Sequence, residues 1–263
     1  MSAKKLNTNA WQIPKYTIHE FFKKKKTKYC LVIPVINEGT RIQKELAKIK
    51  KYTPLIDVVL VDGGSTDGSL NTNFLRKQKV RALLTSPKGQ SIQYRAAFAY
   101  ALKQDYEGIV TIDGNNKDDP SALPKFTKAL DEGFDYIQAS RFIKGGKHAH
   151  TPSDRIFFNR LVISPLLSLA AGKWYTDTPL ALRGYSQKYL LHPGVQPFRG
   201  IFQRYELLFY LVTRANRLGL KSKEIPTKRS YPKGVVPTKI IGWKKVTDMI
   251  NVIKIALGRY NPK

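Results

Sequence analysis

The residues best suited to chemistry follow an apolar stretch near the middle of the chain. Four strand-forming residues at 109–112 (IVTI) run directly into Asp113, Gly114 and Asn115. Val, Ile and Thr favour a buried strand, whereas Gly and Asn tolerate the tight backbone of a loop. An Asp and an Asn two positions apart can offer two oxygen ligands to one hard divalent cation, which can neutralise a diphosphate. The same short pattern also occurs at plain strand-to-helix turns, so on its own it leaves both readings open.

The polar stretch continues for four more residues. Lys117 could contact a diphosphate, and a solvated lysine fits the same position equally well. Asp118 and Asp119 precede Pro120 and a predicted helix at 121–130. These two acids could supply charge to the site through water, but acids and Pro are common at helix N-termini, so a capping role fits at least as well and we place both outside the core site.

Other apolar stretches end in polar, glycine-bearing loops of the same kind. We predict strands at 29–34, 56–61, 80–85 and 134–139, and an amphipathic helix at 41–51. Alternating strand and helix signals predict a mostly parallel sheet covered on both faces. Right-handed crossovers place the carboxyl ends of such strands on one rim. The loops PVINEG, DGGSTD, PKGQ and DGN should therefore converge on one crevice, where open α/β sheets bind their ligands.

Length and composition indicate one compact domain. The chain has 263 residues, of which 42% are hydrophobic and 25% charged, enough to bury one sizeable core;. The single Cys30 lies in an apolar run, so it forms no intrachain disulfide and fits a reducing compartment;. Residues 1–28 contain no apolar signal segment, and no stretch of about 18 apolar residues occurs;. We expect neither secretion nor a membrane span.

The charge of the chain requires polyanionic surroundings. Lys and Arg number 46 against 19 Asp and Glu, which gives a formal net charge of +27. Nucleic acid, anionic lipid and a phosphorylated substrate all satisfy this excess, so charge alone does not choose among them. The basic run at 23–26 is either a solvated patch or a contact with lipid headgroups;.

Four motifs, in this order and spacing, carry a resemblance to a known family. The segments PVINEG, VLVDGGSTDGS, TIDGNNKDDP and ASRFIKGG resemble family 2 inverting glycosyltransferases with the GT-A fold. The nearest branch is similar to dolichyl-phosphate mannose synthases and other polyprenyl-phosphate glycosyltransferases. The resemblance implies an α/β, Rossmann-like single domain, with a mostly parallel central sheet flanked by helices. It also implies a hexosyltransferase that uses a nucleotide-sugar donor and a divalent metal, Mg²⁺ or Mn²⁺, and inverts the anomeric centre.

The resemblance also suggests how the chain is organised. We expect a basic N-terminal extension at 1–28 and the glycosyltransferase domain at 29–239. Its nucleotide-binding half would be 29–120 and its acceptor half 121–239. A C-terminal amphipathic helix and tail would occupy 240–263.

The resemblance assigns donor binding to the loops on the predicted rim, with Asp113 and Asn115 as metal ligands and Asp113 counted as catalytic. Asn115 stands where the family's D-x-D signature has its second acid, and Gly63 replaces an acid in the preceding loop. An amide oxygen brings no charge, so we expect weaker metal binding. The implied nucleotide-sugar site comprises Pro34, Asn37, Glu38, Asp62, Ser65, Lys88, Gly89, Asp113, Gly114 and Asn115.

The second half of the chain would bind the acceptor. Guanidinium groups hold phosphate oxygens through two parallel hydrogen bonds, so arginines in family segments are candidates. A hydroxyl acceptor calls for a carboxylate base, whereas a lipid monophosphate, with a second pKa of about 6, needs none. Only two carboxylates occur between residues 141 and 204, which favours the phosphate. The candidate phosphate ligands are Arg141, Arg155, Arg183 and Arg229, of which Arg141 and Arg155 are also counted as catalytic, and the alternative bases are Asp177 and Glu206.

The tail carries an apolar stripe at helical spacing. It comprises Trp243, Val246, Ile250, Ile253 and Leu257;. Such a helix can lie in a membrane interface or pack against the sheet, and the pattern fits both. The net positive charge favours the membrane, so we expect peripheral association with the cytosolic face of an anionic membrane, directly or through a membrane-protein partner;.

Three hypotheses follow from the sequence. The first is sugar transfer from a nucleotide diphosphate sugar to a polyprenyl, dolichyl-type phosphate at a cytosolic membrane face. The second keeps the donor site but uses a hydroxyl of a glycan or lipid-linked oligosaccharide in polysaccharide biosynthesis. The third, motivated by charge alone, is a non-enzymatic α/β module that binds nucleic acid, and the motifs argue against it.

Overall fold

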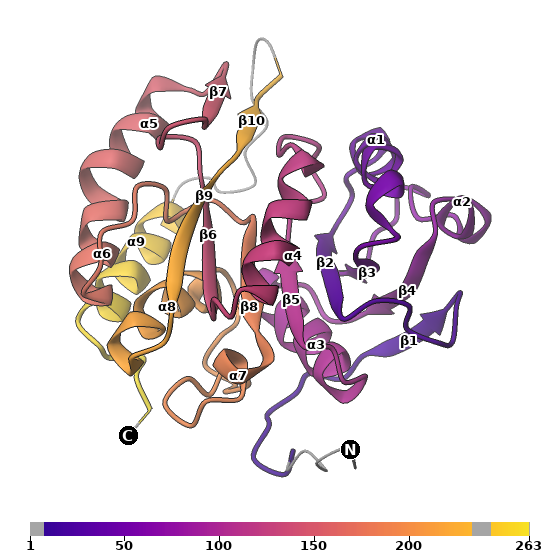
Figure 1. Cartoon of the computed structure of the whole chain (residues 1–263), viewed down its shortest axis with the longest axis horizontal. Helices are drawn as coiled ribbons and strands as arrows, with labels where there is room; N and C mark the ends of the chain where they lie inside the picture. The colour runs from indigo at the N-terminus through magenta and orange to yellow at the C-terminus, as the bar shows by residue number, and fades with distance from the viewer. Residues whose placement is uncertain (1–7, 233–242, 263) are drawn as a thin grey trace.

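A single mixed sheet organises the molecule (Figure 1). The computed structural model describes residues 8–232 and 243–262. Its main sheet has the strand order β1-β4-β3-β2-β5-β8-β6-β9. The predicted mostly parallel α/β architecture is confirmed, with antiparallel pairing only where β1 and β8 join their neighbours. The strands are β1 (Thr17–Glu20), β2 (Tyr29–Val35), β3 (Asp57–Asp62), β4 (Val80–Thr85), β5 (Gly108–Thr111), β6 (Tyr136–Ser140), β8 (Arg183–Ser186) and β9 (Ser222–Pro226).

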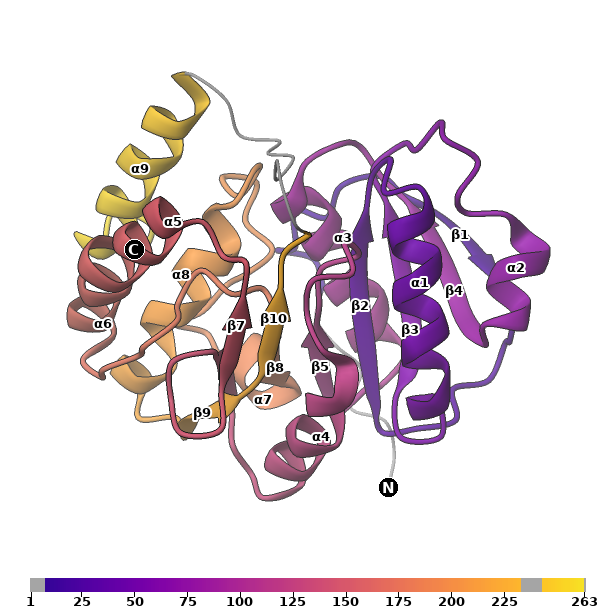
Figure 2. The same cartoon turned by 90° about the horizontal axis from the view of Figure 1, so that it is seen from above.

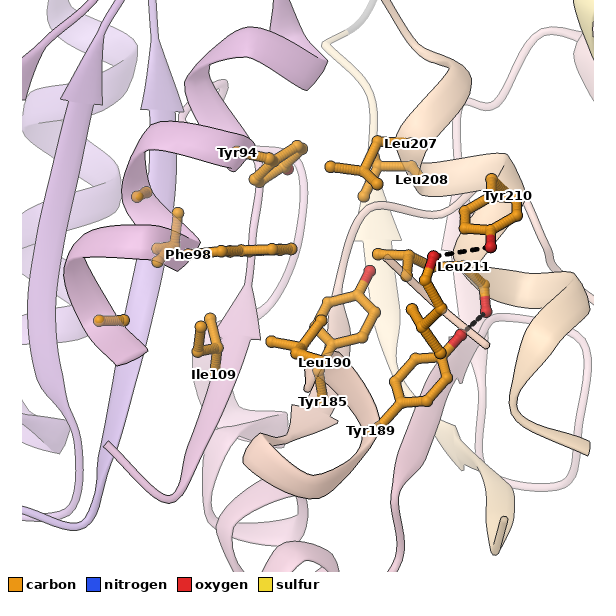
Figure 3. Close-up of a cluster of buried hydrophobic side chains, with 14 of the residues drawn as sticks. Tyr94, Phe98, Ile109, Tyr185, Tyr189, Leu190, Leu207, Leu208, Tyr210 and Leu211 are labelled. Carbon is orange, nitrogen blue, oxygen red and sulfur yellow. Dashed lines mark hydrogen bonds between the residues drawn. The ribbon is translucent and has the colours of Figure 1, made fainter. Parts of the chain in front are cut away.

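Helices cover both faces of this sheet (Figures 1 and 2). One core lies under α1, α2 and α4, and the other lies under α3, α6, α7, α8 and α9. Figure 3 shows part of the second core, where Tyr94 and Phe98 of α3 face Leu207 and Leu211 of α8. The helices are α1 (Thr40–Ile49), α2 (Thr72–Lys77), α3 (Gln90–Lys103), α4 (Leu123–Asp131), α5 (Ser153–Phe158), α6 (Ser164–Ala171), α7 (Gln187–Leu190), α8 (Glu206–Arg214) and α9 (Trp243–Ala256).

Two features were not anticipated. Within the stretch expected to be a basic extension, β1 pairs antiparallel with β4 and forms one edge of the sheet. A second, two-stranded sheet joins β7 (Lys147–Ala149) to β10 (Lys228–Ser230), with His148 opposite Arg229. This small sheet brings the segment after β6 next to the segment after β9.

The final helix presents apolar residues on two sides. Val252 and Ile255 are buried in the core beneath α9. Val246, Ile250 and Ile253 are 43–49% exposed and Leu257 is 68% exposed, so most of the predicted stripe faces outward. The side chain of Trp243, the first member of that stripe, lies outside the described residues.

Candidate functional site

The carboxyl ends of β2, β3 and β5 lie side by side, as the sequence predicts. Val35 pairs with Asp62, and Val32 pairs with Thr111, so the loops that follow these strands leave one rim. The side chain of Gln93, on α3, reaches this rim and donates to the carbonyl oxygens of Val35 and Val61, 3.0 and 2.7 Å away. These two hydrogen bonds provide partners for backbone carbonyl groups at the strand ends, where the regular hydrogen bonding between strands stops.

Two of the predicted donor loops are tied to each other. The Asn37 side-chain oxygen accepts from the Thr66 amide at 2.8 Å, and the Ser65 hydroxyl accepts from the Asn37 amide at 3.0 Å. Asn37 has a φ of 47°, a left-handed conformation that asparagine tolerates better than most residues;. Asp62 is buried and accepts from the Ser65 amide at 2.9 Å and from its hydroxyl at 2.6 Å. The structure therefore brings Asn37, Asp62 and Ser65 together as expected.

Further residues predicted to bind the donor lie at the end of β2, in the loop after β2 and in the loop after β4. Pro34 is half-buried at the end of β2, and Glu38 pairs with Arg41 at 2.9 Å. Lys88 is exposed. Gly89 has a φ of 144°, and a Cβ there would lie 2.5 Å from the Gln203 carbonyl oxygen, so only glycine fits;.

The loop after β5 carries the predicted metal ligands. Gly114 is packed so closely that a Cβ would lie 3.2 Å from Ile42 Cδ1. The Asp113 side chain is 20% exposed. The Asn115 side-chain nitrogen donates to Asp113 Oδ2 at 3.2 Å, and its oxygen accepts from the Lys117 amide at 3.2 Å. The amide of Asn115 must therefore rotate before its oxygen can face a cation beside Asp113.

The pair Asp113 and Asn115 suits a weakly bound cation, and not a cation whose ligands all come from the protein. Among residues 8–232 and 243–262, no cluster of three or more His, Cys, Asp or Glu side chains could hold a metal. One carboxylate and one amide oxygen suit Mg²⁺ or Mn²⁺ when phosphate oxygens and water complete the shell. The donor set is thus compatible with a metal that arrives with a diphosphate.

Asp118, which we placed outside the core site, instead belongs to an ionic chain at the site. It is buried and accepts from Arg229 Nη1 at 2.5 Å, while Arg229 Nη2 lies 3.4 Å from Asp113 Oδ2. Burial would lower the pKa of Arg229, but the charges of Asp118 and Asp113 raise it, so this guanidinium stays charged;. Capping is performed by Asp119, whose carboxylate accepts from the Ser121 amide at 2.9 Å.

The predicted acceptor residue Arg141 is held by Asp177. Arg141 Nε and Nη2 donate to the two Asp177 oxygens at 2.7 and 2.9 Å, and Asn159 donates to Asp177 at 2.6 Å. Asp177 has no exposed surface, and each hydrogen bond that its carboxylate accepts comes from a buried residue of the protein. A base needs access to the proton it removes, so this structure does not support Asp177 as a base. Arg141 Nη1 is also buried, and it has no hydrogen-bond partner in the described part of the chain.

The other alternative base and one predicted phosphate ligand are also committed to the fold. Glu206 is buried and accepts from the amides of Gln203 and Arg204 at 3.1 and 2.6 Å, which holds the turn that precedes α8. Arg183 has no exposed surface and donates to the carbonyl oxygens of Leu180, Thr178 and Leu208. The donors of Arg183, predicted to hold phosphate, are thus used inside the core, and the structure does not present this guanidinium at the rim.

Arg155 and Lys117 remain half-buried on the same side as Arg229. The cationic groups of all three lie within 5.4 Å of the centre of the Tyr231 ring. Sequence analysis did not single out Tyr231, and nothing in its local pattern would have identified it. The ring lies beside Arg229, whose guanidinium contacts the carboxylate of Asp113.

Glu45, on α1, is a buried carboxyl group that sequence analysis also missed. It has no exposed surface, and neither of its oxygens has a hydrogen-bond partner among the described residues. Burial, followed by the negative charge of Asp118, raises the pKa of Glu45 to about 8;. Glu45 is therefore protonated at neutral pH in the folded protein.

This shift predicts a pH dependence of stability. A carboxyl group whose pKa is raised by folding stabilises the protein fully below its ordinary pKa, and this contribution is lost as the pH rises through about 8;. Glu45→Gln removes the titration. The melting temperature of the variant should rise by several degrees relative to wild type between about pH 5.5 and about pH 8.5. Thermal unfolding across this range checks it, with the exposed Glu107→Gln as control, and parallel curves for Glu45→Gln and wild type would contradict it.

Comparison with known proteins gives a family and a fold. The profile of the glycosyl transferase family 2 domain matches residues 30–205. The chain is 29% identical over 128 residues to an undecaprenyl-phosphate mannosyltransferase of Micrococcus luteus, covering 47% of this chain and 52% of that protein. It is 27% identical over 139 residues to a polyprenol monophosphomannose synthase of Mycolicibacterium smegmatis, covering 51% of each. The chain thus spans about half the length of these relatives.

Another relative and a solved structure extend the comparison. A dolichyl-phosphate hexose transferase of Haloferax volcanii is 28% identical over 163 residues, covering 62% of this chain and 67% of that protein. Glucosyl-3-phosphoglycerate synthase of Mycobacterium tuberculosis, crystallised with Mn²⁺, UDP and glucosyl-3-phosphoglycerate, superposes with a TM-score of 0.61 at 17% identity. That superposition covers 88% of this chain and 79% of the other. At this identity it establishes the shared GT-A fold.

Proposed function

The chain belongs to glycosyl transferase family 2, and from this premise we propose that it transfers a sugar from a nucleotide diphosphate sugar to a polyprenyl phosphate. Transfer would invert the anomeric centre and take place at a cytosolic membrane face. The names of the relatives, which act on undecaprenyl, polyprenol or dolichyl phosphates, support this acceptor class.

One observation carries the choice of a phosphate acceptor over a hydroxyl. Both candidate bases, Asp177 and Glu206, are buried and saturated with hydrogen bonds. The cations Lys117 and Arg155 instead lie half-buried beside Arg229. A hydroxyl acceptor would need a free carboxylate, whereas a phosphate oxygen is already ionised and needs cations to hold it.

The donor would lie on the rim formed by the loops of Asn37, Asp62 and Asp113. A divalent cation would be held there by Asp113 and, after rotation of its amide, by Asn115, and it would supply neutralisation of the departing diphosphate. The protein's own part is to fix the loops through Gln93 and the Asn37–Ser65 bonds. These contacts position the donor before the acceptor arrives.

The acceptor experiment uses matched lipids. Purified protein, Mn²⁺ and labelled nucleotide sugars are incubated with a polyprenyl phosphate or with the corresponding polyprenol, and the organic phase is counted. Label should enter the phosphate lipid alone. Label in the polyprenol, or only in an added oligosaccharide, would contradict the proposed acceptor and favour the hydroxyl chemistry.

An outward apolar surface supports contact with the bilayer that carries such an acceptor. None of the helices in the described part of the chain has the length and apolar character needed to span a bilayer. The exposed stripe of α9 and the exposed Phe157, Phe158 and Leu161 lie at the end of the molecule formed by α5, α6 and α9 (Figures 1 and 2). With the strongly positive net charge, this surface fits an anionic membrane;.

A substitution in the stripe tests the membrane contact. Ile250 is 45% exposed, so Ile250→Asp should leave the fold intact while it removes apolar area and adds a negative charge. Binding to vesicles rich in anionic lipid should weaken about tenfold or more, the equivalent of one lost apolar side chain. Vesicle sedimentation measures it. Ile18→Asp is the matched control, because Ile18 is 49% exposed on β1 at the opposite end of the sheet. Equal losses for both variants, or none for Ile250→Asp, would contradict a contact through α9.

A further inference from the structure

Tyr231 is fixed at the point where the small sheet meets the loop after β5. It directly follows β10, and its amide donates to the Ala149 carbonyl oxygen at 2.9 Å. The neighbouring Ser230 amide donates to the Lys117 carbonyl oxygen at 2.8 Å. Tyr231 is 7% exposed. The ring is therefore held by two backbone connections, one to β7 and one to the metal-site loop.

Three cations from three separate segments surround this one ring. Lys117 Nζ lies 4.9 Å from the ring centre, and the guanidinium carbons of Arg155 and Arg229 lie 5.4 Å from it. They come from the loop after β5, from α5 and from β10. A cation over an aromatic face gains about 0.5–2 kcal/mol, depending on how far it is desolvated. The ring thus offsets part of the repulsion among the three charges.

The cluster keeps an excess of positive charge. Arg229 is paired with Asp118 and Asp113. Among the described residues, Lys117 and Arg155 have no carboxylate within ion-pair distance. A bound dianion would supply the negative charge that the protein itself does not place beside Lys117 and Arg155.

The phenol group adds a second function to the ring. Burial would raise the pKa of Tyr231, but the charge of Arg229 and hydrogen bonds from Arg155 and Arg229 lower it. The phenol group thus interacts favourably with guanidinium groups on two segments, and it links them. Arg229 in turn lies 3.4 Å from Asp113, so this linkage ends at the proposed metal ligand.

We propose that Tyr231 is a positioning residue for the acceptor phosphate, whose ring and hydroxyl gather Lys117, Arg155 and Arg229 into one anion-binding group beside Asp113. This inference rests on the proposed function, because it takes the anion to be the monophosphate of a prenyl acceptor. Tyr231 itself carries out no chemical step. Tyr231 fixes the positions of the three cations. These cations in turn fix where the phosphate oxygen meets the donor.

The test measures binding, with a short soluble prenyl monophosphate as the probe and the matching prenyl alcohol as its control. Calorimetric titrations are run with nucleoside diphosphate and Mn²⁺ present. Tyr231→Leu should weaken binding of the prenyl phosphate about tenfold or more, because the cations lose their common partner. Tyr231→Phe keeps the ring and loses the linkage, so it should weaken binding about threefold. Nucleotide affinity should stay within about twofold of wild type in both variants.

Tyr52→Leu controls for the loss of a tyrosine beside a lysine, since Lys51 Nζ lies 5.1 Å from the Tyr52 ring in the turn after α1. That variant should bind the probe like wild type. Should Tyr231→Leu fail to fold, Tyr231→Phe and Lys117→Gln decide the matter, with wild-type probe affinity in both overturning the proposal. If wild type binds the probe and Tyr231→Leu binds it equally well, only the role of Tyr231 fails. If wild type binds neither the phosphate nor the alcohol, the proposed acceptor fails with it.

Discussion

Asp113→Asn should lower the rate of sugar transfer by about a hundredfold or more at ordinary Mn²⁺ concentrations. Asp113 is the only charged oxygen ligand in the proposed pair, and its side chain is partly exposed at the rim. A metal that neutralises a departing diphosphate contributes several kcal/mol to the transition state, and each 1.4 kcal/mol is about tenfold in rate. Initial rates across a Mn²⁺ titration measure the effect.

Asn115→Asp is the converse variant. It restores the second acid at a position where the chain offers only a neutral oxygen, so half-maximal activity should need about tenfold less Mn²⁺. The two substitutions lie two residues apart in one loop, and they should move metal dependence in opposite directions. A near wild-type rate for Asp113→Asn would show that the metal lies elsewhere.

Asp177→Asn should lower the free energy of unfolding by about 3–5 kcal/mol, the usual result when one partner of a buried ion pair is lost. Asp177 has no exposed surface, and the Arg141 side chain that it holds is 6% exposed. The substitution keeps the volume and removes the charge, which leaves the guanidinium buried without its counter-ion. Urea unfolding measures it.

Asp154→Asn is the control for this loss, since Asp154 is an exposed acid on α5. Its free energy of unfolding should stay within about 0.5 kcal/mol of wild type. A stable Asp177→Asn protein that has lost all transfer would contradict the structural role and restore Asp177 as a candidate base.

The rim of the sheet could be predicted because its signals are local. The stretch at 29–34 is apolar on both faces and that at 80–85 is mostly apolar, and β2 and β4 form there with one residue's difference at most. Once parallel strands are predicted, handedness alone places their carboxyl ends together. Asn37, Asp62 and Asp113 could thus be brought to one edge without a structure.

The acceptor side could not be predicted in the same way, because burial there depends on segments far apart in the sequence. Arg183 and Arg155 have the same side chain and both occur in segments that resemble the family. The first is enclosed by backbone carbonyls between β5 and β6, and the second faces Tyr231 from α5. The main sheet buries Arg183, whereas the pairing of β7 with β10 brings Tyr231 close to Arg155, and no local pattern predicts either arrangement.

The acids give the same lesson. Asp118 and Asp119 are adjacent and both suit a helix N-terminus, yet one caps a turn and the other is buried against Arg229. The partner of Asp118 lies 111 residues away.

The apolar stripe of the tail could be seen in the sequence, but the side that it faces could not. Because α9 also buries Val252 and Ile255, the spacing of its apolar residues alone could not say which side faces outward.

The identity of the bond formed by the enzyme tests the central claim most directly. The lipid product made from one nucleotide sugar and a polyprenyl phosphate is purified, and its ³¹P and ¹H spectra are recorded. We predict a phosphodiester between the anomeric carbon and the lipid phosphate, with the anomeric configuration opposite to that of the donor. A sugar joined to a hydroxyl oxygen, or a phosphodiester with the donor's configuration retained, would contradict the account.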